Sequence, residues 1–497
     1  MPEKGEECSA KGIKVLKPGV LIPKRGPISI AELQARRGFC ADFAEGSRNP
    51  FKALLLMENA SSHVNKTDSL SRGKAMPNMG TAAARPASLW HNRDFLLLWS
   101  GQIVSAIGSQ VSLIAFPWVI LAVTGSPAQA GLIAAMRTLP YILFGLPAGA
   151  LIDRWNRKRV MILCDTGRAL ALGSIPIAFA FGLLTAVQLY LVSFIEGTLF
   201  IFFGLAEAAA LPRVVSQEQL SGATAQNEFV YSVSGLLGPS FSGILYSIGN
   251  AMPFLADAVS YVVSVCSLLF IKTQFQQERT AAPRVGGRSI ARLWTEILDG
   301  MHWLWHHTVI RFLAVLVSGL DLCGAGYVLI VLVLAQQHHA SKLATGLILA
   351  SGGIGSILGA LIAGPLASRF RVGQLMIIAS WLLALTWLPF AFAQGPVVLG
   401  LIVASAFIVV PIHSSVQYGY RLASIPDKLQ GRVNSIYRVV LFGCQSVGLL
   451  LTGVLLQAIG PVLTVLLLFV PQCILALAAT FYKPLRNAPR LSEVQPS

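Results

Sequence analysis

The chain has 497 residues, of which 54% are hydrophobic and only 12% are Asp, Glu, Lys or Arg. Soluble globular domains carry about twice that share of charged residues, so the composition excludes an ordinary water-soluble protein. The formal net charge of +16 would suit a nucleic-acid-binding protein. The basic residues, however, stand in short runs between long apolar stretches, which argues against nucleic acid as a partner. The composition therefore predicts a protein of the lipid bilayer.

The first 94 residues are polar and lack an apolar run near the ~20 residues that a helix needs to cross a bilayer. The apolar patch at 54–57 is too short for the core of a signal sequence, and no cleavage site of small residues follows it. We expect a disordered cytoplasmic tail over 1–94. Because Met76 and Met79 precede the first membrane-like stretch, the alternative is a start at one of them, with the upstream residues a gene-start artefact.

Twelve apolar stretches follow, each long enough to span a bilayer as a helix at 1.5 Å rise per residue. They predict an all-α polytopic membrane protein. The expected spans cover 95–122, 130–152, 160–182, 187–210, 228–249, 251–272, 309–335, 343–366, 372–393, 397–420, 432–458 and 461–482.

Lys and Arg collect in the loops on one side of these spans. The loops after the second, sixth, eighth and tenth spans and the C-terminal tail are basic, whereas the turns on the other side hold only Lys342. Cytoplasmic loops retain positive charge. We therefore expect both termini in the cytoplasm.

An internal repeat appears when the halves are slid by 363 − 148 = 215 residues, because 148–151 then matches 363–366 and Arg154 faces Arg369. The repeat predicts two six-helix bundles that enclose a midplane cavity, as in many secondary transporters. The expected parts are the bundles 95–272 and 309–482, a basic cytoplasmic linker over 273–308 and a cytoplasmic tail over 483–497.

The loop after the second predicted span, 149–159, resembles the loop 2–3 signature of the major facilitator superfamily. In that family this loop acts as a cytoplasmic latch, so the resemblance implies the same role here. Asn156 stands where the family usually has glycine. The latch residues implied are Gly149, Asp153, Arg154, Arg157, Lys158 and Arg159.

Further segments resemble the bacterial drug-exporter branch that includes the macrolide efflux proteins, and the resemblance covers roughly 90–482. They include L-W-S-G-Q at 98–102, L-P-R-V-V at 211–215 and F-L-A-D-A at 254–258. The resemblance implies alternating access, with proton entry driving export of amphipathic drug-like or metabolite molecules. The fifth span also resembles the glycine–proline antiporter motif, at Gly235, Gly238, Pro239 and Gly243.

Ionisable groups inside membrane spans are costly and are candidates for function. Asp165 and Arg168 share one face of the third span, and Glu207 lies near the same cytoplasmic third of the fourth. We expect these three to form a structural or gating ion-pair cluster. Asp257 near the outer end of the sixth span is expected to have a polar or helix-cap role. Arg137 in the second span is expected to pair with Asp257, with an anionic substrate group as the alternative partner.

Glu196 and Asp321 lie near the midplane, one in each half, and neither has an arginine three or four residues away. A carboxylate buried without a partner can take up and release protons near neutral pH. We expect one or both to carry the coupled proton, the alternative being a hydrogen bond to a neighbouring helix. Ser109 stands where the branch often has an acid, so proton coupling depends on these midplane acids and on the family.

The seven cysteines stand singly, without a C-x-x-C pair or a histidine at metal spacing, and no ATP-binding P-loop is present. We expect no metal, no cofactor and no use of ATP. The partners expected are a small-molecule substrate, protons and the lipid of a bacterial inner membrane, with the protein a monomer. Export or flipping of a siderophore or lysolipid is the alternative. A membrane-embedded enzyme is disfavoured, because the spans hold only isolated acids.

Overall fold

The computed structural model describes residues 89–152, 154–275, 290–490 and 493. Most of the predicted N-terminal tail, Asp153 of the predicted latch and residues 276–289 of the predicted linker lie outside these residues. Every regular element described is helical. The first half, 89–275, holds α3 (Arg93–Thr124), α4 (Pro127–Thr138), α5 (Pro140–Phe144), α6 (Pro147–Ile152), α7 (Arg157–Ala180), α8 (Ala186–Val214), α9 (Gln217–Ile248) and α10 (Met252–Phe270) after a short 3-10 helix, η1 (Leu89–His91).

The second half, 290–490, repeats this sequence of long helices, with one short 3-10 helix, η2 (Leu388–Phe392). Its α-helices are α11 (Ile290–His306), α12 (Thr308–Gly324), α13 (Tyr327–Gln337), α14 (Lys342–Arg369), α15 (Val372–Leu385), α16 (Pro396–Ser424), α17 (Asp427–Phe481) and α18 (Lys483–Arg486).

Side-chain caps determine where several helices begin. Asn92 accepts hydrogen bonds from the first-turn N–H groups of α3, and Asn156 accepts one from the N–H of Arg159 in α7. Such oxygens satisfy N–H groups that have no partner within the helix. Asn156, which departs from the resembled signature, therefore serves as the cap that starts α7.

Nine helical segments in the described part of the chain are long and apolar enough to cross a membrane. The predicted second span is divided into α4, α5 and α6, with Pro140 and Pro147 opening the latter two. The predicted eleventh and twelfth spans run together in α17. Gly460 interrupts α17 with φ of 75°, a left-handed conformation that glycine adopts without steric cost.

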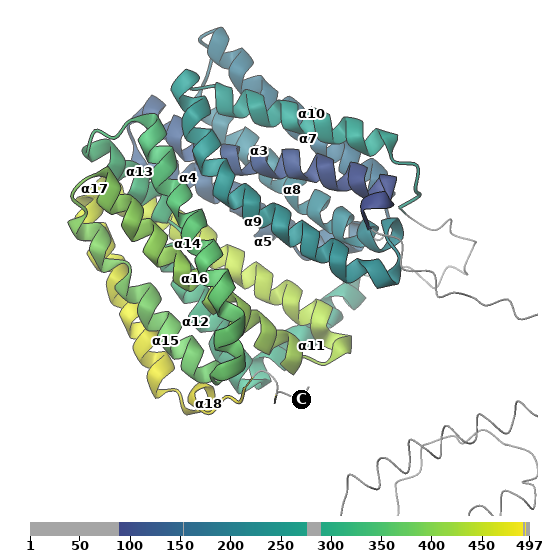
Figure 1. Ribbon diagram of the computed structural model, residues 1–497, viewed down its shortest axis with the longest axis vertical. Helices are drawn as coiled ribbons and strands as arrows, with labels where there is room; N and C mark the ends of the chain where they lie inside the picture. The colour runs from purple at the N-terminus through teal and green to yellow at the C-terminus, as the bar shows by residue number, and fades with distance from the viewer. Residues whose placement is uncertain (1–88, 153, 276–289, 491–492, 494–497) are drawn as a thin grey trace, which may run out of the picture. The chain divides into compact units, whose positions relative to one another are not determined.

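Helices of the two halves touch through small residues. α9 lies beside α14, and α4 lies beside α17 (Figure 1). A Cβ added to Gly243 of α9 would lie 2.9 Å from the Cα of Gly346 in α14, and one added to Gly131 of α4 would lie 2.9 Å from the Cα of Gly453 in α17. Glycines at these four positions let the helix backbones approach closely.

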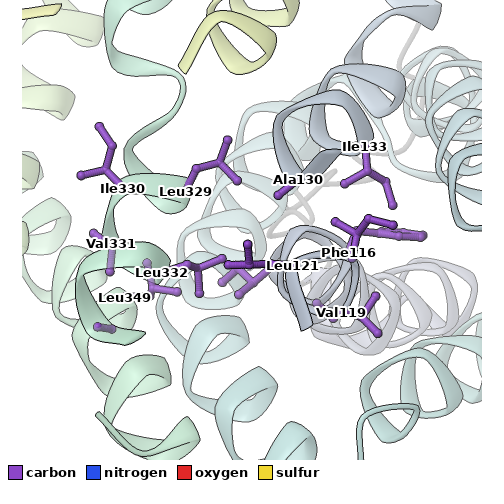
Figure 2. Packing of buried hydrophobic residues seen from close by; sticks show 14 of the residues in the cluster. Phe116, Val119, Leu121, Ala130, Ile133, Leu329, Ile330, Val331, Leu332 and Leu349 are labelled. Carbon is purple, nitrogen blue, oxygen red and sulfur yellow. The ribbon is translucent and has the colours of Figure 1, made fainter. Parts of the chain in front are cut away.

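The hydrophobic core is shared at one end of the helices and divided at the other. Figure 2 shows side chains of α3 and α4, among them Phe116 and Ile133, in one cluster with Leu332 of α13 and Leu349 of α14. This shared cluster lies next to the short turns at 125–126, 249–251 and 338–341, which we call the turn end. Next to the basic loops, the loop end, each half has its own cluster.

Candidate functional site

Hydrogen bonds between the halves strengthen the turn end. The Ser126 hydroxyl donates to Gln457 Oε1 at 2.6 Å, and deeper in the molecule Thr138 and Ser446 share a hydrogen bond of 2.7 Å. Lys342 at the start of α14 donates to the carbonyl oxygen of Tyr246 at 3.2 Å. The Tyr246 carbonyl lies in the last turn of α9, where a cation is favoured by the helix dipole. Together with the shared core, these contacts close the turn end.

At the loop end, the described latch residues bind within the first half. Arg157 donates to the carbonyl oxygen of Ala209 at 2.8 Å, and Lys158 donates to that of Ile271 at 2.7 Å. Arg154 and Arg159 are exposed, and the space around the Cα of Gly149 is open. These contacts tie the start of α7 to α8 and to the end of α10. The latch function of this loop stays a prediction.

A cavity of about 330 Å³ lies among α3, α4, α5, α7, α8, α9 and α17. Its walls are largely aromatic and apolar, and Tyr141 of the first half stacks on Phe442 of the second with ring centroids 3.9 Å apart. Arg137 and Arg168 bring two guanidinium groups to the wall. Apolar walls with a few placed polar groups are typical of small-molecule binding sites.

Both guanidinium groups bind the same buried carboxylate. Arg137 donates to Glu196 through Nε at 2.5 Å and through Nη2 at 3.2 Å. Arg168 donates to Glu196 at 2.9 Å through Nη2 and to Asp165 at 3.3 Å through Nη1. Hydrogen bonds between charged partners are among the strongest in proteins. The arrangement therefore fixes two cationic groups at the cavity wall.

The expectation that Glu196 is buried without an arginine partner is wrong. Its partners come from α4 and α7, which are 59 and 28 residues away along the chain. A search three or four residues away on its own helix could not find them. Arg137 consequently pairs with Glu196 instead of Asp257.

The predicted cluster of Asp165, Arg168 and Glu207 forms in part. Asp165 pairs with Arg168, but Glu207 accepts its hydrogen bond from the Asn227 amide of α9 at 3.2 Å. Glu207 is buried, with 6% of its surface exposed. The Arg168 side chain instead faces Glu196 and Tyr261, whose ring centroid lies 4.0 Å from the guanidinium carbon. Glu196 thus takes the place in the cluster that was expected for Glu207.

Asp321 and Asp257 have contrasting surroundings. The side chain of Asp321 on α12 is accessible although other residues surround it, and no hydrogen bond or ion pair joins its carboxylate to another described side chain. Asp257 of α10 is fully buried and accepts a hydrogen bond of 3.1 Å from Ser260. A Cβ added to Gly108 of α3 would collide with Asp257 Oδ1. The close approach of α3 to Asp257 therefore requires glycine at position 108.

The residues of the antiporter-like motif pack α9 against its neighbours. A Cβ on Gly238 would collide with Gln110 of α3, Gly243 meets Gly346 of α14, and Gly235 has open space. Pro239 lies inside α9, and its carbonyl oxygen would lie 2.9 Å from a Cβ on Gly346. The motif therefore lies at the contact between α9, α3 and α14. Its part in antiport stays a prediction.

A helical membrane protein whose two halves share one core and flank an apolar cavity with buried charges has the architecture of a secondary transporter. A family model for the major facilitator superfamily, described as transmembrane secretion effector, matches residues 85–494. The chain belongs to that family. It is accordingly a transporter with a small-molecule substrate rather than an enzyme.

Relatives and a solved structure agree with this assignment. The chain is 28% identical to the multidrug efflux pump Tap of Mycolicibacterium fortuitum over 79% of this chain and 96% of that protein. It is 25% identical to macrolide efflux protein A of Streptococcus pyogenes over 74% and 90%. The crystal structure of the nucleoside transporter NupG superposes with a TM-score of 0.61 at 16% identity, over 78% of this chain and 100% of that one. That likeness concerns the fold alone.

Proposed function

We propose that the protein is a secondary active exporter that moves amphipathic drug-like or metabolite molecules out of a bacterial cell in exchange for protons. The observation that carries the proposal is the cavity lined by helices of the first half and by α17 of the second, with aromatic walls and with two guanidinium groups held by Glu196. The similarity to drug efflux pumps supports the direction of transport.

We infer twelve crossings in two six-helix bundles, with both termini in the cytoplasm and the protein acting as a monomer in the inner membrane. The break at Gly460 divides α17 into two spans. α4 to α6 together have the length of one crossing, and α9 has the length of another. The loop end then carries the basic loops and faces the cytoplasm. The described conformation is therefore closed toward the outside.

Alternating access requires the turn-end contacts to separate when the substrate leaves. The glycine contacts of Gly243 with Gly346 and of Gly131 with Gly453 suit this separation, because backbone meets backbone there without a side chain from either glycine. The latch residues at the loop end then meet the second half in the outward-open state. In this proposal the coupled protons bind among the buried polar groups around Glu196 in the first half and at Asp321 in the second.

Drug susceptibility of cells and transport by inverted membrane vesicles test this function directly. The protein is expressed in a host that lacks its own pumps, drug susceptibility is profiled, and each drug to which resistance rises is tested in inverted vesicles. Exchange predicts that the drug dissipates an imposed pH gradient. If resistance rises but no drug changes the gradient, then proton exchange is wrong while export stands.

A second candidate is export of an anionic siderophore or lysolipid. One observation favours it: Arg137 lines the cavity, and its buried Nη1 has no hydrogen-bond partner among the described residues. A buried donor without an acceptor is costly, so an anionic or carbonyl group of the substrate would be stabilised there. Melting temperatures measured with macrolides, catecholate siderophores and lysolipids separate the candidates, and replacing Arg137 with Gln should abolish only the shift caused by an anion.

A further inference from the structure

We propose that Asp257, rather than Glu196, is the carboxyl group that binds the coupled proton in the first half of the transporter. The inference rests on the proposed proton exchange and names the residue that carries it out. Three observations support the inference: the position of Asp257 on α10, the number of buried charges around it, and the contact of Asp257 Oδ2 with the Ser112 hydroxyl, neither of which has another hydrogen-bond partner among the described residues.

One face of α10 supplies polar groups to three of the four buried acids described in the first half, Asp165, Glu196 and Asp257, and we call these acids with their partners the polar layer. The fourth acid, Glu207, is outside this layer and accepts its hydrogen bond from Asn227 of α9. Asp257, Ser260, Tyr261 and Ser264 are spaced three and four residues apart, so they share one side of the helix, and all four are buried. Ser264 donates to Asp165 at 2.6 Å. Tyr261 donates to Glu196 at 3.4 Å and shares a hydrogen bond of 2.6 Å with Ser109 of α3. Asp257 therefore belongs to the same polar layer as the arginine network.

The charges in this layer do not balance unless one acid is protonated. Three buried carboxyl groups, Asp165, Glu196 and Asp257, face two guanidinium groups. Both arginines direct their ion pairs to Asp165 and Glu196, and among the described residues no cation forms an ion pair with Asp257. An ionised carboxylate without a partner is strongly disfavoured inside a membrane protein. A single proton on Asp257 makes the layer neutral.

Two buried atoms that face each other mark where that proton can be held. Asp257 Oδ2 and the hydroxyl of Ser112 on α3 have no other hydrogen-bond partner in the described part of the chain. The Ser112 hydroxyl can donate to an ionised Oδ2 and accept from a protonated one, so this contact serves both states of Asp257, as reversible proton binding requires. The close contact at Gly108 keeps α3 near enough for this hydrogen bond.

The groups around Asp257 explain how its proton is coupled to the cavity. Release breaks the O–H bond of Asp257, passes the proton to water and leaves one uncompensated negative charge in the layer. That charge attracts Arg168, whose Nε is buried and unpartnered and whose guanidinium also lines the cavity. The groups that face Asp257 are Ser112 of α3, Arg168 of α7, Glu196 of α8, and Ser260 and Tyr261 of α10 itself.

The variant Asp257→Asn tests this assignment, because it keeps the shape and removes the titrating group. In vesicles we expect it to lose accumulation of a drug driven by a pH gradient, while counterflow exchange of that drug remains. The matched control is Asp299→Asn, which removes an exposed carboxylate that pairs with Arg432. This variant should keep both activities. Gradient-driven accumulation by Asp257→Asn at the wild-type rate would overturn the assignment.

Infrared spectroscopy of the purified proteins provides a second readout that needs no substrate. A protonated carboxylic acid has its own carbonyl band. The spectrum of Asp257→Asn should therefore lack one such band that the wild type shows, whereas the spectrum of Glu196→Gln should keep it. An unchanged band in Asp257→Asn overturns the proposal even if that variant transports poorly. If the wild type itself ignores a pH gradient, the proposed exchange fails, and the infrared result still decides where the proton resides.

Discussion

Arg137 of α4 and Glu196 of α8 form an ion pair of 2.5 Å at the wall of the cavity. The same carboxylate also binds Arg168 of α7, which reaches Asp165 on its own helix. A molecule that contacts Arg137 or Arg168 in the cavity therefore contacts the end of a charge network that continues into the interior of the first half. In the proposed exchange, this continuity would give substrate binding and proton binding a common set of residues.

Replacing Glu196 with Gln should destabilise the protein. Both guanidinium groups would then lose their shared carboxylate, and breaking a buried ion pair by removing one partner costs about 3–5 kcal/mol. The melting temperature of the purified protein is the measurement. The double variant Arg137→Gln with Glu196→Gln is the control, since removing one charge of each sign should recover part of the loss. A single variant that melts like the wild type would show that the network contributes little to stability.

Replacing Asp321 with Asn, in contrast to replacing Glu196, should affect transport more than stability. The side chain is exposed and is joined to no other described side chain, so the melting temperature should stay close to that of the wild type. If Asp321 couples protons in the second half, drug efflux driven by a pH gradient should fall. Efflux and melting are measured on the same preparation. Unchanged efflux would remove Asp321 from the proton-coupling groups.

The sequence predicted the helical class and several helices closely, but it predicted the partners of the buried charges poorly. The apolar lengths placed α7, α8 and α10 within a few residues, because burial in a bilayer imposes a length that composition reveals. The partners of Glu196 come from two other helices, and only helix packing determines which side chains meet. Asp257 illustrates the same limit: its proximity to Gly108, 149 residues earlier, depends on how α3 lies against α10.

The pH dependence of stability should include a contribution from His307 at the start of α12. Its Nδ1 accepts the N–H of Ile310 at 3.3 Å, and partial burial lowers the pKa of the imidazole. The unfolded chain then binds the proton more readily than the folded chain, so this contribution is present at neutral pH and is lost as the pH falls below the ordinary value of about 6.5. Replacing His307 with Asn keeps an N-cap acceptor. The drop in melting temperature from pH 7 to pH 5 should therefore be smaller in that variant.

Closure of the turn end can be tested by crosslinking. Ser126 and Gln457 share a hydrogen bond of 2.6 Å between the halves, so cysteines at both positions, in a background without the native cysteines, should be bridged by a short bifunctional methanethiosulfonate reagent in the described conformation. Because alternating access requires this contact to separate, the crosslink should stop drug efflux and a reductant should restore it. Each single cysteine variant, treated with the same reagent, is the control. Efflux that continues with the crosslink fully formed would show that the halves do not separate at the turn end during transport.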